Sequence, residues 1–190
     1  MRASTALILP LVFAAAACGS PAPKPAPQAD VSAALPIDAG PSAAPTRAAA
    51  TLRTGDGKDA GTVTLLPAGS GMRLAVEVKG FTPGEHGIHI HTTGKCDGPK
   101  FESAGAHWNP AGKQHGMKNS AGAHAGDMPN LTVTADGSGI VNITLSGGSV
   151  ADLLDADGAA LVVHAKPDDQ TTDPSGNSGD RIACGVLDAS

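Results

Sequence analysis

Aromatic side chains are almost absent from this chain, which has no tyrosine, one tryptophan and three phenylalanines among its 190 residues. A hydrophobic core must therefore consist mostly of valine, leucine and isoleucine. The chain also lacks any cluster of lysines or arginines and carries a formal net charge of -5, which argues against nucleic acid as a partner. It has no long amphipathic helical stretch, and its length leaves room for one ordinary domain and a tail.

The N-terminus has the layout of a bacterial secretory signal. Arg2 precedes an apolar run at residues 6–17 that is interrupted only by Pro10, and the small residues Ala15, Ala16 and Ala17 stand directly before Cys18. We predict a signal peptide at residues 1–17 and a lipidated Cys18. The alternatives are an ordinary signal peptide cleaved near the same point and a short membrane anchor, although the run is too short to span a bilayer comfortably.

Residues 18–47 are rich in proline, alanine, serine and glycine. Such a segment cannot bury enough apolar surface to fold, so we expect a disordered tether between the lipidated cysteine and a domain at residues 48–190. The protein would then be exported and lipid-anchored to the bacterial cell envelope, on its periplasmic or extracellular face. In that compartment Cys96 and Cys184 are left over as a disulfide pair.

Alternation with a period of two residues predicts strands in the remainder of the chain. Apolar residues alternate with others from Leu74 to Lys79 and from Val141 to Leu145, as in half-buried strands. Asp136-Gly137 predicts a hairpin between residues 131–134 and 140–145, and Gly55-Asp56-Gly57 separates two earlier strands. With irregular stretches at residues 92–128 and 166–180, the pattern indicates an antiparallel sandwich or barrel with two long functional loops.

Six of the seven histidines form an ordered set. His89 and His91 share one face of a strand, which taken alone is weak evidence for a metal site. A stretch rich in glycine then supplies further possible ligands, and the last histidine follows much later: His107, His115, His124, Asp127 and finally His164. Imidazole suits copper and zinc, and three histidines with one aspartate make a closed tetrahedral zinc set. The alternative, a scatter of solvated loop histidines, is plausible for one of these residues and poor for four.

The same residues, together with the segments Gly122–Asp127, Leu161–His164 and Gly176–Val186, resemble the copper/zinc superoxide dismutases over about Ala48 to Leu187. The resemblance implies an all-β fold, an eight-stranded antiparallel Greek-key barrel or sandwich of immunoglobulin-like type, with copper and zinc as cofactors. It implies copper ligands at His89, His91, His107 and His164, and zinc ligands at His107, His115, His124 and Asp127. His107 would bridge the two ions as an imidazolate.

Other residues receive roles from this resemblance. Asp168 would be an outer-shell carboxylate that links a copper ligand to a zinc ligand, and Arg181 would attract and bind the anionic substrate. His86 matches a structural histidine, and Cys96 and Cys184 match an intrasubunit disulfide. The stretch from residue 166 to 180 is shorter than the family's charge-guiding loop and carries four aspartates against one lysine, so anion steering would rest mainly on the copper site and Arg181.

The implied activity is the conversion of two superoxide anions and two protons to dioxygen and hydrogen peroxide, with Arg181 and His107 as catalytic residues. The enzyme would protect the cell envelope from superoxide outside the cytoplasm. A copper-handling or metal-storage lipoprotein on the same scaffold would predict a lost copper ligand or a missing arginine, and an adhesive sandwich with incidental histidines is a third reading. The sequence leaves open whether the protein is a monomer or a homodimer.

Overall fold

A computed structural model describes residues 47–190 of the chain. The predicted signal peptide, Cys18 and the tether up to residue 46 lie outside the described residues. The regular elements of the described part are mostly strands: β1 (Ala48–Thr54), β2 (Asp59–Ala68), β3 (Gly71–Val78), β4 (Gly84–His86), β5 (Ile88–His91), β6 (Leu131–Val133), β7 (Gly139–Ser146), β8 (Ala159–His164) and β9 (Arg181–Ala189). Two short helical turns accompany them, η1 (Glu102–Ala104) and α1 (Val150–Leu153).

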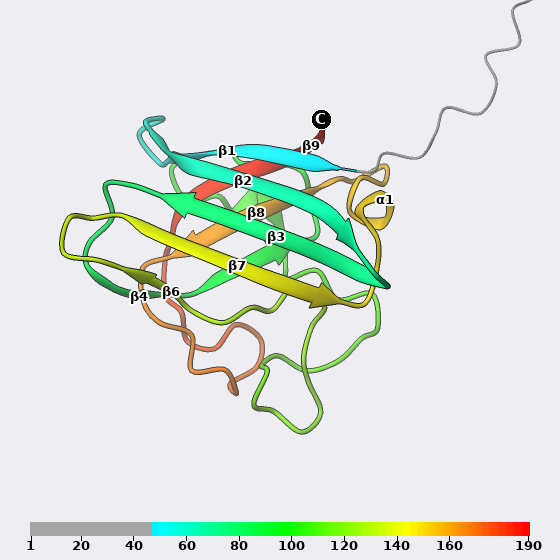
Figure 1. Ribbon diagram of the computed structural model, residues 1–190. Coiled ribbons are helices and arrows are strands. Elements are labelled where there is room, and N and C mark those ends of the chain that lie inside the picture. The colour runs from blue at the N-terminus through cyan, green and yellow to red at the C-terminus, as the bar shows by residue number, and fades with distance from the viewer. Residues whose placement is uncertain (1–46) are drawn as a thin grey trace, which may run out of the picture. The chain divides into compact units, whose positions relative to one another are not determined.

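Seven strands form one sheet in the order β5-β8-β9-β1-β2-β3-β7, and β4 pairs with β6 (Figure 1). Every pairing is antiparallel. The chain crosses between the two ends of this order after β3, after β5 and after β7, which is a Greek-key arrangement. The predicted all-β antiparallel fold is therefore confirmed. Between residues 47 and 190 no helix is long and apolar enough to cross a membrane.

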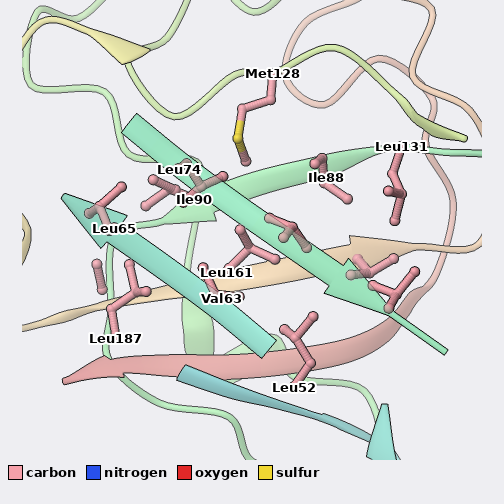
Figure 2. Packing of buried hydrophobic residues seen from close by; sticks show 14 of the residues in the cluster. Leu52, Val63, Leu65, Leu74, Ile88, Ile90, Met128, Leu131, Leu161 and Leu187 are labelled. Atoms are coloured by element: carbon pink, nitrogen blue, oxygen red, sulfur yellow. The ribbon is translucent and has the colours of Figure 1, made fainter. Parts of the chain in front are cut away.

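The sheet curls on itself and encloses one main core of aliphatic side chains, as the low aromatic content predicts. In Figure 2, side chains of β2 and β3 face side chains of β5, β8 and β9: Val63, Leu65 and Leu74 on one side, and Ile88, Ile90, Leu161 and Leu187 on the other. The predicted alternation in β3 is confirmed, because Met72, Leu74, Val76 and Val78 are buried while the residues between them are more exposed. Burial of these side chains is the main force that holds the curled sheet together.

Of the two predicted turns, one joins strands that pair with each other and the other does not. Gly55–Gly57 joins β1 to β2, which pair along their length. The turn at Asp136-Gly137 also forms, with Thr134 N–H donating to Ser138 O at 2.8 Å, but the predicted hairpin is wrong. β6 has three residues and pairs with β4, whereas the eight residues of β7 match β3 from end to end. A turn signal fixes a change of direction, while packing over the core decides which strands pair.

Residues 47–190 form nine strands where eight were predicted, because one extended stretch divides at Gly87. β4 before it pairs with β6, and β5 after it pairs with β8. Gly87 donates its N–H to Lys166 O at 2.9 Å and accepts from His164 N–H at 2.8 Å. A Cβ at this position would lie 2.9 Å from the Cβ of Ser178, so the close approach requires glycine.

Two long connections carry the predicted functional residues. The first loop, residues 92–130, joins β5 to β6, and the second loop, residues 165–180, joins β8 to β9. Figure 1 shows both on the same side of the sheet, the first in green and the second in orange. Backbone hydrogen bonds join them, with Lys118 N–H donating to Gln170 O at 3.0 Å. The loops therefore meet over the strands that carry the histidines.

Candidate metal centre

Strand β5 supplies the first two histidines of the centre. Ile88 and Ile90 point into the core, so His89 and His91 project from the opposite face of the strand, as predicted. Both are fully buried, because the first loop covers this edge of the sheet through the isolated bridges His89↔Asp127 and His91↔His107. The first loop therefore covers the outer edge of β5 at these two histidines.

The first loop and the end of β8 complete a four-histidine group, defined as His89, His91, His107 and His164. One ligand atom from each lies within 4.8 Å of those from the others, and all four residues are buried. In each ring, one nitrogen has no hydrogen-bond partner among the described residues: His89 Nδ1, His91 Nε2, His107 Nε2 and His164 Nε2. Leaving a buried polar atom unpaired costs about 1–3 kcal/mol, and a metal ion satisfies four such lone pairs at once. The donor set therefore fits a metal that prefers nitrogen ligands.

The other nitrogen of each of these rings is held in place. His91 Nδ1 lies 2.9 Å from Gly105 O, and His164 Nδ1 lies 3.2 Å from Gly179 O. His89 Nε2 lies 2.7 Å from Asp168 Oδ2. Hydrogen bonds of this kind fix the tautomer and the ring orientation of a metal ligand.

A second cluster, the mixed group, consists of His107, His115, His124 and Asp127. Asp127 Oδ1 lies 2.9 Å from His107 Nδ1, 3.0 Å from His115 Nδ1 and 3.2 Å from His124 Nδ1. The His124 and His107 Nδ1 atoms are 3.4 Å apart. Ligands about 2.0–2.1 Å from a tetrahedral zinc are separated by about 3.3–3.4 Å, so the mixed group has the size of a closed zinc site.

By mutual distance alone, the ligand atoms that all lie within 4.8 Å of one another are those of His107, His115, Asp127 and, in place of His124, His89. Its Nε2, however, is bonded to Asp168, and its free nitrogen, Nδ1, belongs to the four-histidine group. His124 is therefore the better fourth ligand for the mixed group. His107 contributes to both clusters, with Nε2 in one and Nδ1 in the other.

Asp168 joins the two clusters through the far sides of two rings. Its Oδ2 accepts from His89 Nε2 at 2.7 Å and its Oδ1 from His115 Nε2 at 3.0 Å. Gln170 N–H donates to the same Oδ1 at 2.6 Å. Sequence reasoning missed the support beneath it, since Asn130 bonds both the N–H and the carbonyl oxygen of Asp168, at 2.8 and 2.9 Å. A lone loop asparagine carries no sequence signal for such a role.

Arg181 begins β9 beside His164, its partner in the strand register. Its Nη1 donates to Phe101 O and its Nη2 to Gly105 O, each at 2.7 Å. The Gly105 carbonyl also pairs with His91, so one backbone oxygen holds both the guanidinium and a ring of the four-histidine group. Arg181 is half-buried and lines a hollow of about 560 Å³ together with Lys100. Glu102 and Asp180 line the same hollow, so it carries two positive and two negative side chains.

The disulfide pairs the two predicted cysteines. Cys96 in the first loop is bonded to Cys184 in β9 with a Cα–Cα distance of 5.6 Å. The bond ties the loop that presents the carbonyls of Phe101 and Gly105 to the strand that presents Arg181. His86 has the predicted structural part, with Nδ1 2.7 Å from His164 O and Nε2 2.9 Å from Thr82 O.

Burial lowers the pKa of the histidines in the four-histidine group. The pKa of His91 falls to about 2, that of His107 to about 4 and that of His164 to about 3. The pKa of His89 is also lowered, because desolvation outweighs its bond to Asp168. Burial penalises the imidazolium form, so these rings are neutral at neutral pH, and neutral imidazole is the form that binds a metal.

His115 has the opposite shift. Burial opposes its charge, but the hydrogen bonds to Asp127 and Asp168 outweigh burial and raise its pKa to about 9. Burial likewise works against the charge of the two carboxylates, yet their bonds to histidines hold the pKa of each well below its usual range. Without a metal, His115 is therefore an imidazolium between two carboxylates, and a metal ion would take the place of its Nδ1 proton.

Comparisons with known proteins point to one family. A family model described as copper/zinc superoxide dismutase (SODC) matches residues 59–187. A relative from Caulobacter vibrioides named superoxide dismutase [Cu-Zn] is 47% identical over 148 residues, covering 74% of this chain and 84% of that protein.

Two solved structures are similar in fold. The Cu/Zn superoxide dismutase from Brucella abortus is 28% identical with a TM-score of 0.60, covering 75% of this chain and 99% of the other. A double mutant of a superoxide dismutase-like protein from Bacillus subtilis, with a tyrosine and a proline each replaced by histidine, is 42% identical with a TM-score of 0.68, covering 73% and 95%. Since the family model spans more than half of the chain and a close relative shares nearly half of the aligned residues, the chain belongs to the copper/zinc superoxide dismutase family.

Proposed function

We propose that the four-histidine group holds copper, that the mixed group holds zinc, and that His107 is the bridging ligand. The single observation that carries this assignment is the set of four buried ring nitrogens without a partner, one from each histidine of the four-histidine group. As a member of its family the chain is an oxidoreductase that acts on superoxide. Copper in such a nitrogen site supplies one-electron redox chemistry, and zinc supplies a fixed charge without redox activity.

Arg181 receives the substrate. Its guanidinium is anchored by two carbonyl oxygens at 2.7 Å, one of which also holds the ring of His91, and its register partner is His164. Burial lowers its pKa, but the ordinary pKa of arginine is so high that the side chain keeps its charge. A superoxide anion can therefore pair with Arg181 beside His91 and His164.

His107 holds one of the two protons that the reaction needs. Its Nε2 faces the four-histidine group while its Nδ1 stays 2.9 Å from Asp127. In the overall balance one superoxide loses an electron and becomes dioxygen, and a second gains that electron and two protons and becomes hydrogen peroxide. No further oxidant or reductant is required.

A copper-handling protein on the same scaffold is the second candidate. The Bacillus subtilis neighbour is named only superoxide dismutase-like, and its double mutant gains two histidines. This chain keeps all six histidines of the two groups together with Arg181 and Asp168. The complete set favours the catalytic function.

The cellular setting belongs to the same proposal. We place the domain, residues 48–190, outside the cytoplasm, attached through a lipidated Cys18 and a tether, where it removes superoxide at the cell envelope. The Cys96–Cys184 disulfide supports an oxidising compartment. Labelling with a radioactive or alkyne-tagged fatty acid tests the anchor: wild type should incorporate lipid and Cys18→Ala should not.

The enzymatic assignment is tested on the full chain by measuring metal content and superoxide dismutase activity before and after addition of copper and zinc. Copper-loaded protein without activity would refute the enzyme claim. His164→Ala and His124→Ala form a matched pair, since each removes one ring from one group. We expect the first to lose copper and activity while keeping much of the zinc, and the second to lose zinc more than copper; equal loss of both metals in both variants contradicts the assignment.

A further inference from the structure

Each predicted ligand ring other than His107 has one nitrogen toward a metal group and another toward an acceptor. For three rings of the four-histidine group the acceptors are Asp168, Gly105 O and Gly179 O, and for His115 the acceptor is Asp168. His124 is the remaining ring. Its Nδ1 is 3.2 Å from Asp127 Oδ1, and its Nε2 is 3.8 Å from Asp173 Oδ1.

Asp173 contacts two residues of the mixed group, His124 and His115. The same Oδ1 that faces His124 accepts the backbone N–H of His115 at 2.6 Å. Its side chain is about half exposed, at 53%, in contrast to the fully buried carboxylates of Asp127 and Asp168. The contact thus lies at the outer border of the mixed group.

The second loop fixes this position through several other bonds to the first loop. Lys118 N–H donates to Gln170 O at 3.0 Å, and Asn119 Nδ2 donates to Thr171 O at 3.3 Å. These bonds hold the chain just before Asp173 against the chain just after His115. The contacts between the second loop and the first loop therefore hold the Asp173 carboxylate next to His124.

His124 has the greatest need of such a partner. It is the most exposed ligand of the mixed group, at 9%, and its Nε2 has no hydrogen bond within 3.5 Å among the described contacts. A ring that binds a metal through Nδ1 carries its proton on Nε2, and an acceptor there fixes the ring orientation and raises ligand basicity. A separation of 3.8 Å is closed by a small side-chain rotation or by one bridging water.

We propose that Asp173 is a positioning residue of the zinc site, whose carboxylate accepts the Nε2 proton of His124, directly or through one water, and holds that ring with Nδ1 toward the metal. The proposal rests on the proposed assignment of zinc to the mixed group. It gives the shortened second loop a part in metal retention, in addition to covering the centre.

The test compares Asp173→Asn and Asp173→Ala with wild type in the full chain. Asparagine keeps an oxygen for the His115 N–H but removes the charge, and alanine removes both. Asp157→Asn is the matched control, because it removes one exposed loop carboxylate away from both groups. Zinc affinity is measured by competition with a chromogenic chelator, and cobalt(II) in place of zinc reports ligand geometry through its visible spectrum.

We expect Asp173→Ala to weaken zinc binding by about 10-fold or more, and the zinc affinity of Asp173→Asn to lie between that of Asp173→Ala and wild type. Both variants should change the cobalt spectrum. Their copper affinity, and the zinc affinity of the Asp157→Asn control, should stay near wild type. Zinc affinity within about twofold of wild type in both variants, with an unchanged cobalt spectrum, overturns the proposal, even if the alanine variant melts at a lower temperature. If the alanine variant fails to fold, the asparagine variant decides by the same readouts. If His124→Ala also leaves zinc binding intact, the zinc assignment itself fails; if His124→Ala loses zinc and the Asp173 variants do not, only this proposal fails.

Discussion

Asp168→Asn should weaken metal binding through a mismatch of hydrogen bonds that arises only when the metals are bound. The wild-type carboxylate offers one oxygen to His89 Nε2 at 2.7 Å and the other to His115 Nε2 at 3.0 Å. An asparagine has one oxygen and one NH2 group, so one of the two rings must face a donor. When its Nδ1 binds a metal, that ring carries a proton on Nε2, and two donors then oppose each other in a buried site.

The size of the effect follows from this geometry. Leaving a buried donor unpaired costs about 1–3 kcal/mol, which corresponds to about 5- to 150-fold in affinity. In the metal-free protein the affected ring can escape the conflict by carrying a proton on Nδ1 alone, because His89 can move its proton there and His115 can release the proton on its Nε2. The loss should therefore appear mainly in metal affinity. The affinity for the metal whose histidine faces the NH2 group should fall by this factor. The affinity for the other metal should fall by less, because its histidine still faces an oxygen, although a neutral one in place of a carboxylate.

Copper and zinc dissociation constants, measured by chelator competition on the variant and on wild type, check this prediction. Thermal unfolding of the metal-free and metal-loaded forms separates lost affinity from lost stability, and Asp157→Asn again controls for the change in charge. If both affinities stay within about twofold of wild type, Asp168 does not fix its two histidines and the reasoning is refuted.

Three further predictions concern the surroundings of the metals. Arg181→Lys keeps a charge but cannot hydrogen-bond two carbonyl oxygens at 2.7 Å, so kcat/KM should fall by about 10-fold with copper content unchanged. Stopped-flow decay of superoxide measures this rate, and an unaltered rate would show that Arg181 has no part in the mechanism. Replacing both Cys96 and Cys184 by alanine removes a disulfide that spans a sequence separation of 88. The free energy of unfolding, measured in urea, should fall by up to about 4–5 kcal/mol. A loss below about 1 kcal/mol would contradict the loop-entropy argument. The histidines of the four-histidine group have pKa values below the ordinary 6.5 in the folded, metal-free protein. The unfolded chain therefore binds more protons below that value, and the stability that these histidines contribute is present above pH 6.5 and is lost as the pH falls from there toward their folded pKa values. The melting temperature of the metal-free protein should drop between about pH 7 and pH 4, and circular dichroism would show no slope there if the rings were exposed.

The members of the two clusters could be predicted because candidate metal ligands are visible as residue types. His89 and His91 alternate with core isoleucines, and the later histidines and Asp127 stand in a glycine-rich stretch, so a chemical inventory and a familiar order were enough to find them. The alternation in β3 and the turn at Gly55–Gly57 were also predictable, because burial on one face and tight turns leave local patterns.

Contacts between segments far apart in the chain were not predictable. The hairpin of β6 and β7 was wrong since the pairing of β7 with β3 is selected by packing over the core. The backbone oxygen of Gly105, which holds both His91 and Arg181, leaves no trace in the sequence because every residue has such an oxygen. The same is true of the approach of Asp173 to His124, which depends on how two loops dock.

The sequence by itself determined the candidate ligands and the all-β class, because both depend on side-chain chemistry and short-range periodicity. Only the tertiary structure decided which nitrogen of each ring is free and which is held, as in His107, whose Nε2 is free while its Nδ1 lies beside Asp127. Hydrogen bonding in a buried site is directional and joins residues distant in sequence, so ring orientation exists only once the loops have closed over the sheet.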